Sequence, residues 1–378
     1  MNLHVTDDTY GLYTLEIVER IKNSTYKKNN HVLTLSENVV FKDESVDYIP
    51  GTKISYKKFI SKAKNLNKII FHPYNFTCYE FLKIVLTKFP NIRIYWVCWS
   101  YEFYNLPHVV NKLYEPFSSA YIKSKRSVFS KGKQILSDTL KYILSALGIK
   151  MSYWKKLKHL SSLPDYFCSP FPTDFLYLNQ IIPQNHLIFE SFAYLSINKL
   201  IPDCEDFISA GDKIMIGHCS SPDGNHYEVI EKISSICRDY PIFIPLSYGD
   251  MEYGSLIKKA AHFYFDHVEI LEKTLDKSVY YRKLSEVGWA IINVKVQQGV
   301  GNIIGLLCMG VKVFLNKNSS IYIDFSNWGV IIFNIQDHLN KNELETKLSQ
   351  DDINCNKKIM LDIFGEKKVS EYWQKILF

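Results

Sequence analysis

Short β-rich apolar runs alternate with segments of helical periodicity along the first half of the chain. The apolar runs cover residues 31–35, 68–71 and 93–97, and an early helical pattern extends from Leu12 to Ile21. Strands that are separated by helical segments favour βαβ units, because parallel neighbours need a long crossover connection. The pattern therefore predicts a doubly wound parallel sheet in this half.

The same alternation restarts in the second half. The apolar runs there cover residues 213–216, 241–244, 289–292, 311–314 and 330–333. Between the two sets the chain is polar and locally acidic, which predicts a domain boundary near residue 205. We therefore expect an α/β protein with two Rossmann-like domains, over 1–205 and 206–360, whose parallel sheets face each other across a cleft. An amphipathic helix within 361–378 is expected to pack at the domain junction.

Composition indicates a folded protein with enough apolar residues for two cores. Of 378 residues, 47% are apolar, 15% are aromatic and only 22% are charged, unlike a disordered chain. The eight cysteines include no Cys-x-x-Cys pair and no histidine cluster has metal-ligand spacing, so we expect neither a zinc module nor a disulfide framework. The first residues lack the features of a signal peptide, and no apolar stretch reaches the roughly 20 residues of a spanning helix. We expect a cytoplasmic protein.

Positive charge is concentrated in one segment. Residues 121–160 hold ten lysines and arginines against one aspartate, a net charge of +9, whereas the whole chain carries +6. Apolar residues from Ile135 to Leu147 recur near one face of a helix. This pattern is typical of an amphipathic helix on an anionic membrane surface, and it equally fits a core-facing helix with a lysine-rich outer side. Nine of the ten basic residues are lysine, which disfavours nucleic acid as a partner.

Two loops that follow strands of the second half carry candidate chemistry. The first, Gly217 to Glu228, is rich in small and hydroxylated residues and opens a helix, and its Asn225 and Glu228 have the spacing of a capping box. The second, Gln297 to Asn302, has two glycines at a helix start, where backbone N–H groups favour a diphosphate. The chain has no P-loop, and the second loop is not a nicotinamide fingerprint. Both patterns also fit loops that only cap a helix and turn the chain.

Several separated motifs, taken in order, resemble a known family. They are Phe71-His72, Trp96 to Tyr104, Ile216 to Glu228, Pro245 to Asp250 with Tyr253, and Gln297 to Asn302. Together these segments resemble the 4-acetamido-4,6-dideoxygalactose transferases, glycosyltransferase family 56. The chain departs from the family pattern in three places, namely Gly217-His218-Cys219 for Gly-Asn-Ser, Ser100-Tyr101-Glu102 for Gly-x-Asp, and Val296 for a basic residue.

The resemblance implies a GT-B fold, with the acceptor on the N-terminal domain, the nucleotide-sugar donor mainly on the C-terminal domain, and no metal or other cofactor. It implies transfer of a 4-acetamido-4,6-dideoxyhexose, or a related deoxy-amino sugar, from a TDP-sugar to an undecaprenyl-diphosphate-linked oligosaccharide. Such a reaction belongs to O-antigen (lipopolysaccharide) or enterobacterial common antigen synthesis. The basic segment 121–160 would hold the enzyme on the cytoplasmic face of the inner membrane. The alternative is a non-catalytic scaffold of the polysaccharide assembly machinery that binds a nucleotide sugar without turnover.

The resemblance and the loop chemistry together give a set of expected site residues. For the donor these are Gly217, Ser220, Asn225, His226, Ser247, Tyr248, Gly249, Gln297, Gln298, Gly299, Gly301 and Asn302, with none as a metal ligand. His226 would donate to phosphate if it were protonated. Glu102 is the expected catalytic base, because aromatic neighbours raise the pKa of a buried carboxyl group, and His72 is the second candidate. The acceptor sugars are expected to bind Trp99, Tyr101 and Tyr104, although this aromatic cluster also fits a core.

Overall fold

The computed structural model divides into two compact units. The residues that it describes are 1–7, 12–104, 107–125, 158–183, 186–201, 209 and 211–378. Unit 1 consists of Met1–Phe103, Asp138–Tyr194 and Val369–Phe378, and unit 2 consists of Tyr104–Ser137 and Leu195–Lys368. The predicted boundary near residue 205 and most of the basic segment, residues 126–157, lie outside the described residues.

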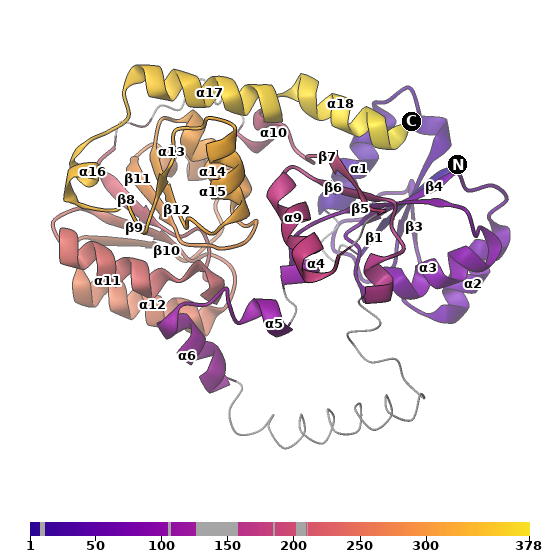
Figure 1. Ribbon diagram of the computed structural model, residues 1–378, viewed down its shortest axis with the longest axis horizontal. Helices are drawn as coiled ribbons and strands as arrows, with labels where there is room; N and C mark the ends of the chain where they lie inside the picture. Colours follow the sequence, from indigo (N-terminus) through magenta and orange to yellow (C-terminus); the bar gives the residue numbers. More distant parts are fainter. Residues whose placement is uncertain (8–11, 105–106, 126–157, 184–185, 202–208, 210) are drawn as a thin grey trace. The chain divides into compact units, whose positions relative to one another are not determined.

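Unit 1 is built on a seven-stranded, wholly parallel sheet (Figure 1). In the order in which they lie in the sheet, its strands are β3 (Val46–Tyr48), β2 (Asn30–Thr34), β1 (Asn2–Thr6), β4 (Lys68–His72), β5 (Arg93–Val97), β6 (Tyr166–Ser169) and β7 (Ile188–Ser191). Its helices are α1 (Leu12–Lys22), η1 (Lys27–Asn29), α2 (Lys53–Lys62), α3 (Phe76–Lys88), α9 (Pro172–Ile181) and most of α4 (Tyr101–Tyr104) and of α18 (Glu366–Leu377). The strand order reverses between β1 and β4, so the loops after these strands form the switch point at which such folds bind ligands.

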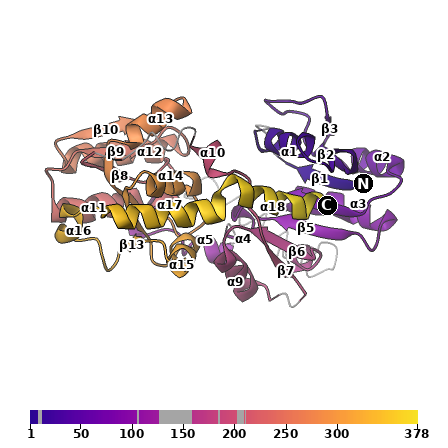
Figure 2. The same cartoon turned by 90° about the horizontal axis from the view of Figure 1, so that it is seen from above.

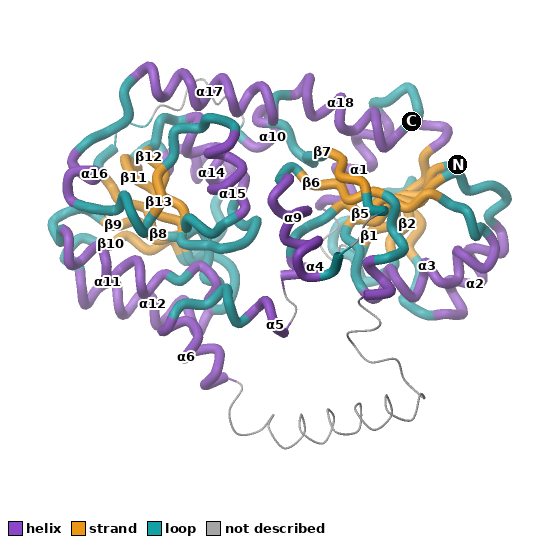
Figure 3. The backbone as a smooth tube through the Cα atoms, in the orientation of Figure 1, coloured by secondary structure: helices purple, strands orange, loops and turns teal. Residues whose placement is uncertain are grey.

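Unit 2 is built on a six-stranded, wholly parallel sheet, drawn in orange in Figure 3. Its strands, again in sheet order, are β10 (Val268–Leu271), β9 (Ile242–Pro245), β8 (Lys213–Ile216), β11 (Val287–Ile292), β12 (Lys312–Leu315) and β13 (Phe333–Asn334). Its helices are α5 (Pro107–Val110), α6 (Pro116–Lys125), α10 (Ile197–Leu200), η2 (Pro222–Gly224), α11 (His226–Ile236), α12 (Met251–Tyr264), α13 (Lys277–Leu284), α14 (Val300–Cys308), α15 (Ser320–Asn327), α16 (Lys341–Glu345) and α17 (Gln350–Phe364). Here the order reverses between β8 and β11.

The predicted α/β class with two parallel sheets is confirmed, and so are most of the predicted strands. The exception is the run 330–333, of which only Phe333 is in a strand, the two-residue β13. In unit 2, α11 and α12 cover one face of the sheet, and their apolar residues form a single core with alternate residues of β8, β9 and β11. On the other face α17 lies along α14 (Figure 2). Both faces of the sheet are therefore buried, as a doubly wound fold requires.

The C-terminal helix buries the apolar residues that its periodicity predicts. Val369, Trp373 and Ile376 of α18 are all buried in the fold. The Trp373 indole donates to the Tyr194 carbonyl at 3.2 Å, and the Asn2 amide donates to the Leu377 carbonyl at 2.8 Å. These contacts fix the end of α18 to unit 1. Across the described part of the chain, no helix combines the length and the apolar character needed to cross a membrane.

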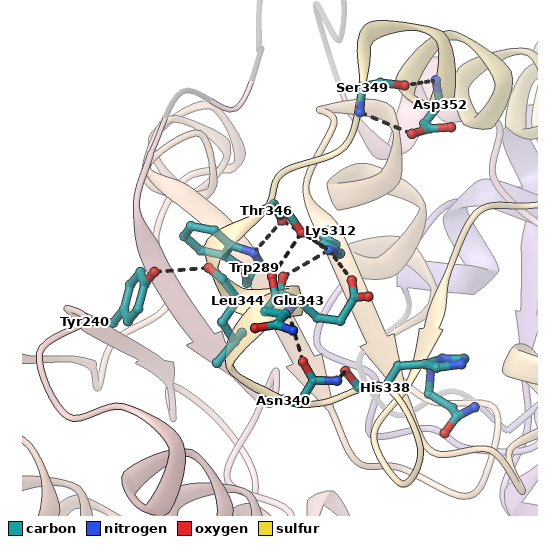
Figure 4. Close-up of polar contacts among 12 residues, drawn as sticks. Tyr240, Trp289, Lys312, His338, Asn340, Glu343, Leu344, Thr346, Ser349 and Asp352 are labelled. Atoms are coloured by element: carbon teal, nitrogen blue, oxygen red, sulfur yellow. Dashed lines mark hydrogen bonds and ion pairs between the residues drawn. The ribbon is translucent and has the colours of Figure 1, made fainter.

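A buried lysine fixes the segment that contains α16 at the amino-terminal ends of β11 and β12 (Figure 4). Lys312 is only 3% exposed, and its ammonium group donates to the Glu343 carbonyl at 2.9 Å and to the Thr346 carbonyl and hydroxyl at 3.1 and 3.0 Å. It also pairs with the Glu343 carboxylate, and the Trp289 indole donates to the Thr346 carbonyl at 3.3 Å. Burial of this charge is possible because every ammonium hydrogen has an acceptor.

Candidate functional site

Three loops of unit 2 meet at the carboxyl ends of β9, β8 and β11, the adjacent strands around its switch point. The Ser220 amide and hydroxyl both donate to the Tyr248 carbonyl, at 2.8 and 2.6 Å. The Gln298 side-chain amide donates to Asp223 Oδ2 at 2.8 Å. The first pair of bonds joins the loops after β8 and β9, and the last bond joins the loops after β8 and β11. The structure thus brings together the three segments that the sequence predicts for the donor.

Close approach between loops accounts for two of the predicted glycines. Gly217 has a φ of +70°, and a Cβ atom there would lie 2.0 Å from Nε2 of His226. Gly299 has a φ of +65°, and a Cβ atom there would lie 2.9 Å from Cγ of His218. Both histidines are buried, so neither ring can move aside easily. Only glycine fits these positions without strain.

The predicted capping box at Asn225 and Glu228 is wrong. Asn225 lies at the N-cap of α11 but adopts a left-handed conformation, with φ 48°, and its side chain makes no capping hydrogen bond. Instead its Nδ2 donates to the carbonyls of Leu113 and Asn293, both at 3.0 Å. The Glu228 carboxylate accepts from the Phe117 amide at 2.8 Å. These two side chains therefore attach the segment that leads into α6 to the donor loop, and Asn225 shapes that loop through its contacts with backbone.

Burial keeps the two histidines of this site neutral. It lowers the pKa of His218 to about 4 and the pKa of His226 to about 3, the latter partly opposed by the Cys219 backbone. A neutral His226 supplies no positive charge, which disfavours it as the protonated phosphate donor that the sequence suggests. Its ring instead occupies the space that Gly217 and Gly224 leave open.

The other predicted donor residues lie around the start of α14 and after β9. Tyr248 and Gly249 are exposed, Ser247 is half-buried, and Gln297, Gln298 and Asn302 are half-buried. Gly301 serves helix packing, because a Cβ atom there would lie 3.2 Å from Leu200 of α10. The N-cap of α14 is Gly299, which provides no side-chain cap. The first turn of α14 therefore presents backbone N–H groups that an anion can accept from.

Glu102 lies at the carboxyl end of β5 in unit 1, and its carboxylate faces a turn of the backbone. Oε1 accepts from the Trp96 indole at 3.1 Å, and both oxygens accept from the Trp99 amide at 3.1 Å. Ser100, within this turn, has a φ of +68°. Burial raises the pKa of Glu102 to about 7, against the opposing effect of these hydrogen bonds. The carboxyl group is therefore partly ionised at neutral pH, as a general base requires.

His72 is completely buried, and both of its ring nitrogens have partners. Nδ1 lies 2.6 Å from the Tyr194 hydroxyl and Nε2 lies 3.1 Å from Nδ1 of His4. The Trp99 indole donates to the same Tyr194 hydroxyl at 2.9 Å. Burial also holds the pKa of His72 well below its usual range. His72 thus supports Trp99 through Tyr194 and has no ring nitrogen left for a substrate, so the structure disfavours it as the base.

The predicted aromatic positions divide between surface and core. Tyr101 is 40% exposed and Trp99 is half-buried, whereas Tyr104 is only 5% exposed and offers no face to a ligand. The structure adds Tyr13, which is 41% exposed and has its ring centroid 4.4 Å from that of Trp99. Tyr194 completes the cluster, with its centroid 5.8 Å from Trp99. Neither added tyrosine lies near Trp99 in the sequence, so only the parallel sheet brings them together.

Asp223 and His218 lie in the predicted donor loop but are not among the site residues that the sequence predicts. Burial raises the pKa of Asp223, although contacts with Ser221 and Gln298 act in the opposite direction. The only signal in the sequence was an acidic residue in a loop that follows a predicted strand. Its partner Gln298 is 75 residues away, and no local pattern links the two.

A family model and solved structures match this chain. A family model described as 4-alpha-L-fucosyltransferase, glycosyl transferase group 56, matches residues 179–378, which is more than half of the chain. A comparison with curated protein sequences gives no match.

The solved structures that resemble this one include several glycosyltransferases. A glycosyltransferase from Rickettsia africae has a TM-score of 0.62 at 10% identity, over 100% of this chain and 97% of that one. Anabaena HepE in complex with UDP and glucose has a TM-score of 0.63 at 10% identity, over 100% and 99% of the two chains. WaaB, a lipopolysaccharide outer core galactosyltransferase in its apo form, has a TM-score of 0.61 at 10% identity, over 100% and 99%. At this identity the likeness concerns the fold, which is that of the GT-B glycosyltransferases. With the family match and the two parallel-sheet units, it follows that the chain belongs to glycosyl transferase group 56 and is a glycosyltransferase.

Proposed function

We propose that the protein transfers a 4-acetamido-4,6-dideoxyhexose, or a related deoxy-amino sugar, from a TDP-sugar to an undecaprenyl-diphosphate-linked oligosaccharide. The reaction would belong to the synthesis of O-antigen or enterobacterial common antigen. The description of the matching family names a fucosyl group, and fucose, like the proposed sugar, is a 6-deoxyhexose. Anabaena HepE, which has a similar fold, is described with UDP-glucose, which supports a nucleoside diphosphate sugar as the donor.

One observation carries the donor part of this proposal, the convergence of three loops around an uncapped helix at the switch point of unit 2. The leaving diphosphate would lie at the start of α14, between Gly299 and Asn302. Residues 297–298 and 247–249 would lie beside it, with the 217–226 loop as a second wall. The backbone N–H groups and the dipole of α14 would stabilise the negative charge that develops on the diphosphate. Because these groups belong to the protein, we propose that transfer needs no metal ion.

On the acceptor side we propose Glu102 as the base. Its pKa of about 7 allows the carboxylate to take a proton from an acceptor hydroxyl at neutral pH. The partly exposed rings of Tyr13, Trp99 and Tyr101 would contact the apolar faces of the acceptor sugars. These side chains lie at the carboxyl ends of β1 and β5, where ligands bind in such folds.

The first experiment is calorimetric titration of the full chain with TDP, UDP, GDP, CMP and NAD, each with and without magnesium. Selective binding of TDP that does not depend on magnesium supports the proposal. Absence of any nucleotide binding contradicts it. Binding of the donor without turnover of a lipid-linked acceptor would favour the alternative, a non-catalytic scaffold that binds a nucleotide sugar.

The basic segment 121–160 suggests that the enzyme works on an anionic membrane surface, on the cytoplasmic face of the inner membrane, where its lipid-linked acceptor would lie. We expect that changing Lys155, Lys156 and Lys158 to Glu reduces co-sedimentation with vesicles that contain anionic phospholipid. The matched control changes three exposed lysines of α2, at positions 57, 58 and 62, to Glu. An equal loss in both variants would mean that the interaction depends on net charge only.

A further inference from the structure

Several buried polar side-chain atoms in the donor loops have no hydrogen-bond partner among the residues that the structure describes. They include His218 Nδ1, both ring nitrogens of His226, Asp223 Oδ1 and Gln298 Oε1. A buried polar atom without a partner costs about 1–3 kcal/mol, and native proteins contain few of them. A cluster at the switch point of a sheet therefore indicates atoms that receive their partners from a ligand.

Asp223 Oδ1 and Gln298 Oε1 differ from the histidine nitrogens because these two oxygens can only accept hydrogen bonds. The Gln298 Nε2 donates to Asp223 Oδ2 at 2.8 Å, and a carboxylate only accepts, so this bond fixes the orientation of the amide. Ser221 also acts on the Asp223 carboxyl group, but Asp223 Oδ1 and Gln298 Oε1, both acceptors, have no hydrogen-bond partner in the described structure. The backbone of both residues is also fixed. Asp223 lies within η2, and the backbone N–H of Gln298 donates to the Val296 carbonyl at 2.8 Å.

The two fixed acceptor atoms determine which part of the nucleotide sugar can face them, the diphosphate or the hexose. Phosphate oxygens only accept hydrogen bonds at neutral pH, and a carboxylate repels them. The diphosphate therefore lies near Gln298 without facing the two free acceptor atoms, Asp223 Oδ1 and Gln298 Oε1. The groups that can face it are hydroxyl and amide N–H groups. Gln298 directly precedes Gly299, the N-cap of α14, where the proposed diphosphate lies. The hexose is bonded to that diphosphate and is therefore the nearest part of the donor that carries hydrogen-bond donors.

We propose that Asp223 and Gln298 form the sugar-recognition pair of the donor site, in which Asp223 Oδ1 and Gln298 Oε1 accept hydrogen bonds from hydroxyl or amide N–H groups of the hexose. This inference rests on the proposed function. It divides the donor site into two parts. The helix start of α14 offers hydrogen-bond donors to the diphosphate, and the Asp223–Gln298 pair offers acceptors to the sugar. Specificity for the sugar follows, because an analogue without the matching O–H or N–H group would leave a buried acceptor unpaired.

The test compares the affinity for TDP with the affinity for TDP-4-acetamido-4,6-dideoxygalactose by calorimetry. In Asp223→Asn, the new Oδ1 still accepts from Gln298, and an N–H donor replaces the unpartnered oxygen. We expect the affinity for the TDP-sugar to fall about 10- to 100-fold, because a bond to a charged group is lost. The affinity for free TDP should change less than about threefold, because the pair does not face the nucleotide.

The control variant is Glu286→Gln, which removes a carboxylate that pairs with Lys213 at the amino-terminal end of β8. This variant should change neither affinity.

Each result of this comparison decides a different point. Equal losses for TDP and the TDP-sugar would overturn the inference, because the pair would then contact the nucleotide, and so would unchanged affinities for both ligands. If wild-type protein binds neither ligand, the proposed function itself fails. Gln298→Leu gives a second variant in case Asp223→Asn does not fold, which thermal unfolding will show, and we expect from it the same selective loss of affinity for the TDP-sugar.

Discussion

Replacement of Gly217 by alanine tests whether the donor loop depends on the close contact between Gly217 and His226. Two costs follow from the structure. The φ of +70° places alanine in the left-handed region, which costs about 1–2 kcal/mol. The new Cβ would also lie 2.0 Å from His226 Nε2, and overpacking of this kind costs about 1–3 kcal/mol. We expect Gly217→Ala to lower the free energy of unfolding by about 2–5 kcal/mol.

Gly329 provides a matched control in the same unit. Its φ is +82°, but the atom nearest to a new Cβ is Cδ1 of Ile359 at 3.9 Å, an ordinary contact. Gly329→Ala therefore carries only the backbone cost of about 1–2 kcal/mol. The difference between the two variants isolates the contact with His226. Gly329 lies between α15 and β13 and belongs to none of the three donor loops, which follow β8, β9 and β11. Gly329→Ala should therefore also keep the wild-type affinity for TDP.

The assay is urea unfolding of the full chain, followed by tryptophan fluorescence. The two units can unfold in separate transitions, so the comparison uses the transition of unit 2, which contains Trp289 and Trp328. Calorimetry with TDP is the second measurement, and we expect Gly217→Ala to weaken binding at least about tenfold because the loop must shift. If Gly217→Ala is no more destabilising than Gly329→Ala, His226 can move aside and the steric argument is wrong.

Two further predictions concern the proposed base and the buried lysine. Turnover should rise as the pH increases through about 7, because Glu102 has a raised pKa and must lose its proton to act as a base. Glu102→Gln should reduce turnover about 100-fold or more without changing the affinity for TDP, and wild-type turnover by this variant would reject the assignment. Lys312→Met should lower the free energy of unfolding by about 2–4 kcal/mol, because it leaves buried acceptors without a donor. The matched control, Lys317→Met, removes an exposed ion pair with Asp337 and should cost less than about 1 kcal/mol. Equal effects of the two lysine variants in urea unfolding would contradict this account.

The fold class could be predicted from the sequence because it depends on local patterns. Apolar runs of strand length alternate with helical periodicity, and this alternation alone predicts parallel sheets.

The strand β1 shows the limit of such patterns. Its polar residues at positions 2, 4 and 6 look like the solvent face of an edge strand, yet β1 lies inside the sheet, next to β2 and β4. Hydrogen bonds to Asn30, His72 and Thr34 on the neighbouring strands satisfy those side chains.

For the site, the sequence by itself determined which loops carry the chemistry. Glycines, small residues and amides that follow apolar runs predict a ligand-binding edge, and the motifs place the chain in its family. Only the tertiary structure decided what each side chain does there. The pairing of Asp223 with Gln298, the use of Asn225 as a backbone anchor and the complete burial of His72 all depend on partners that are distant in the sequence. Hydrogen bonding and desolvation act between neighbours in space, and the order of strands in the parallel sheets decides which residues become neighbours.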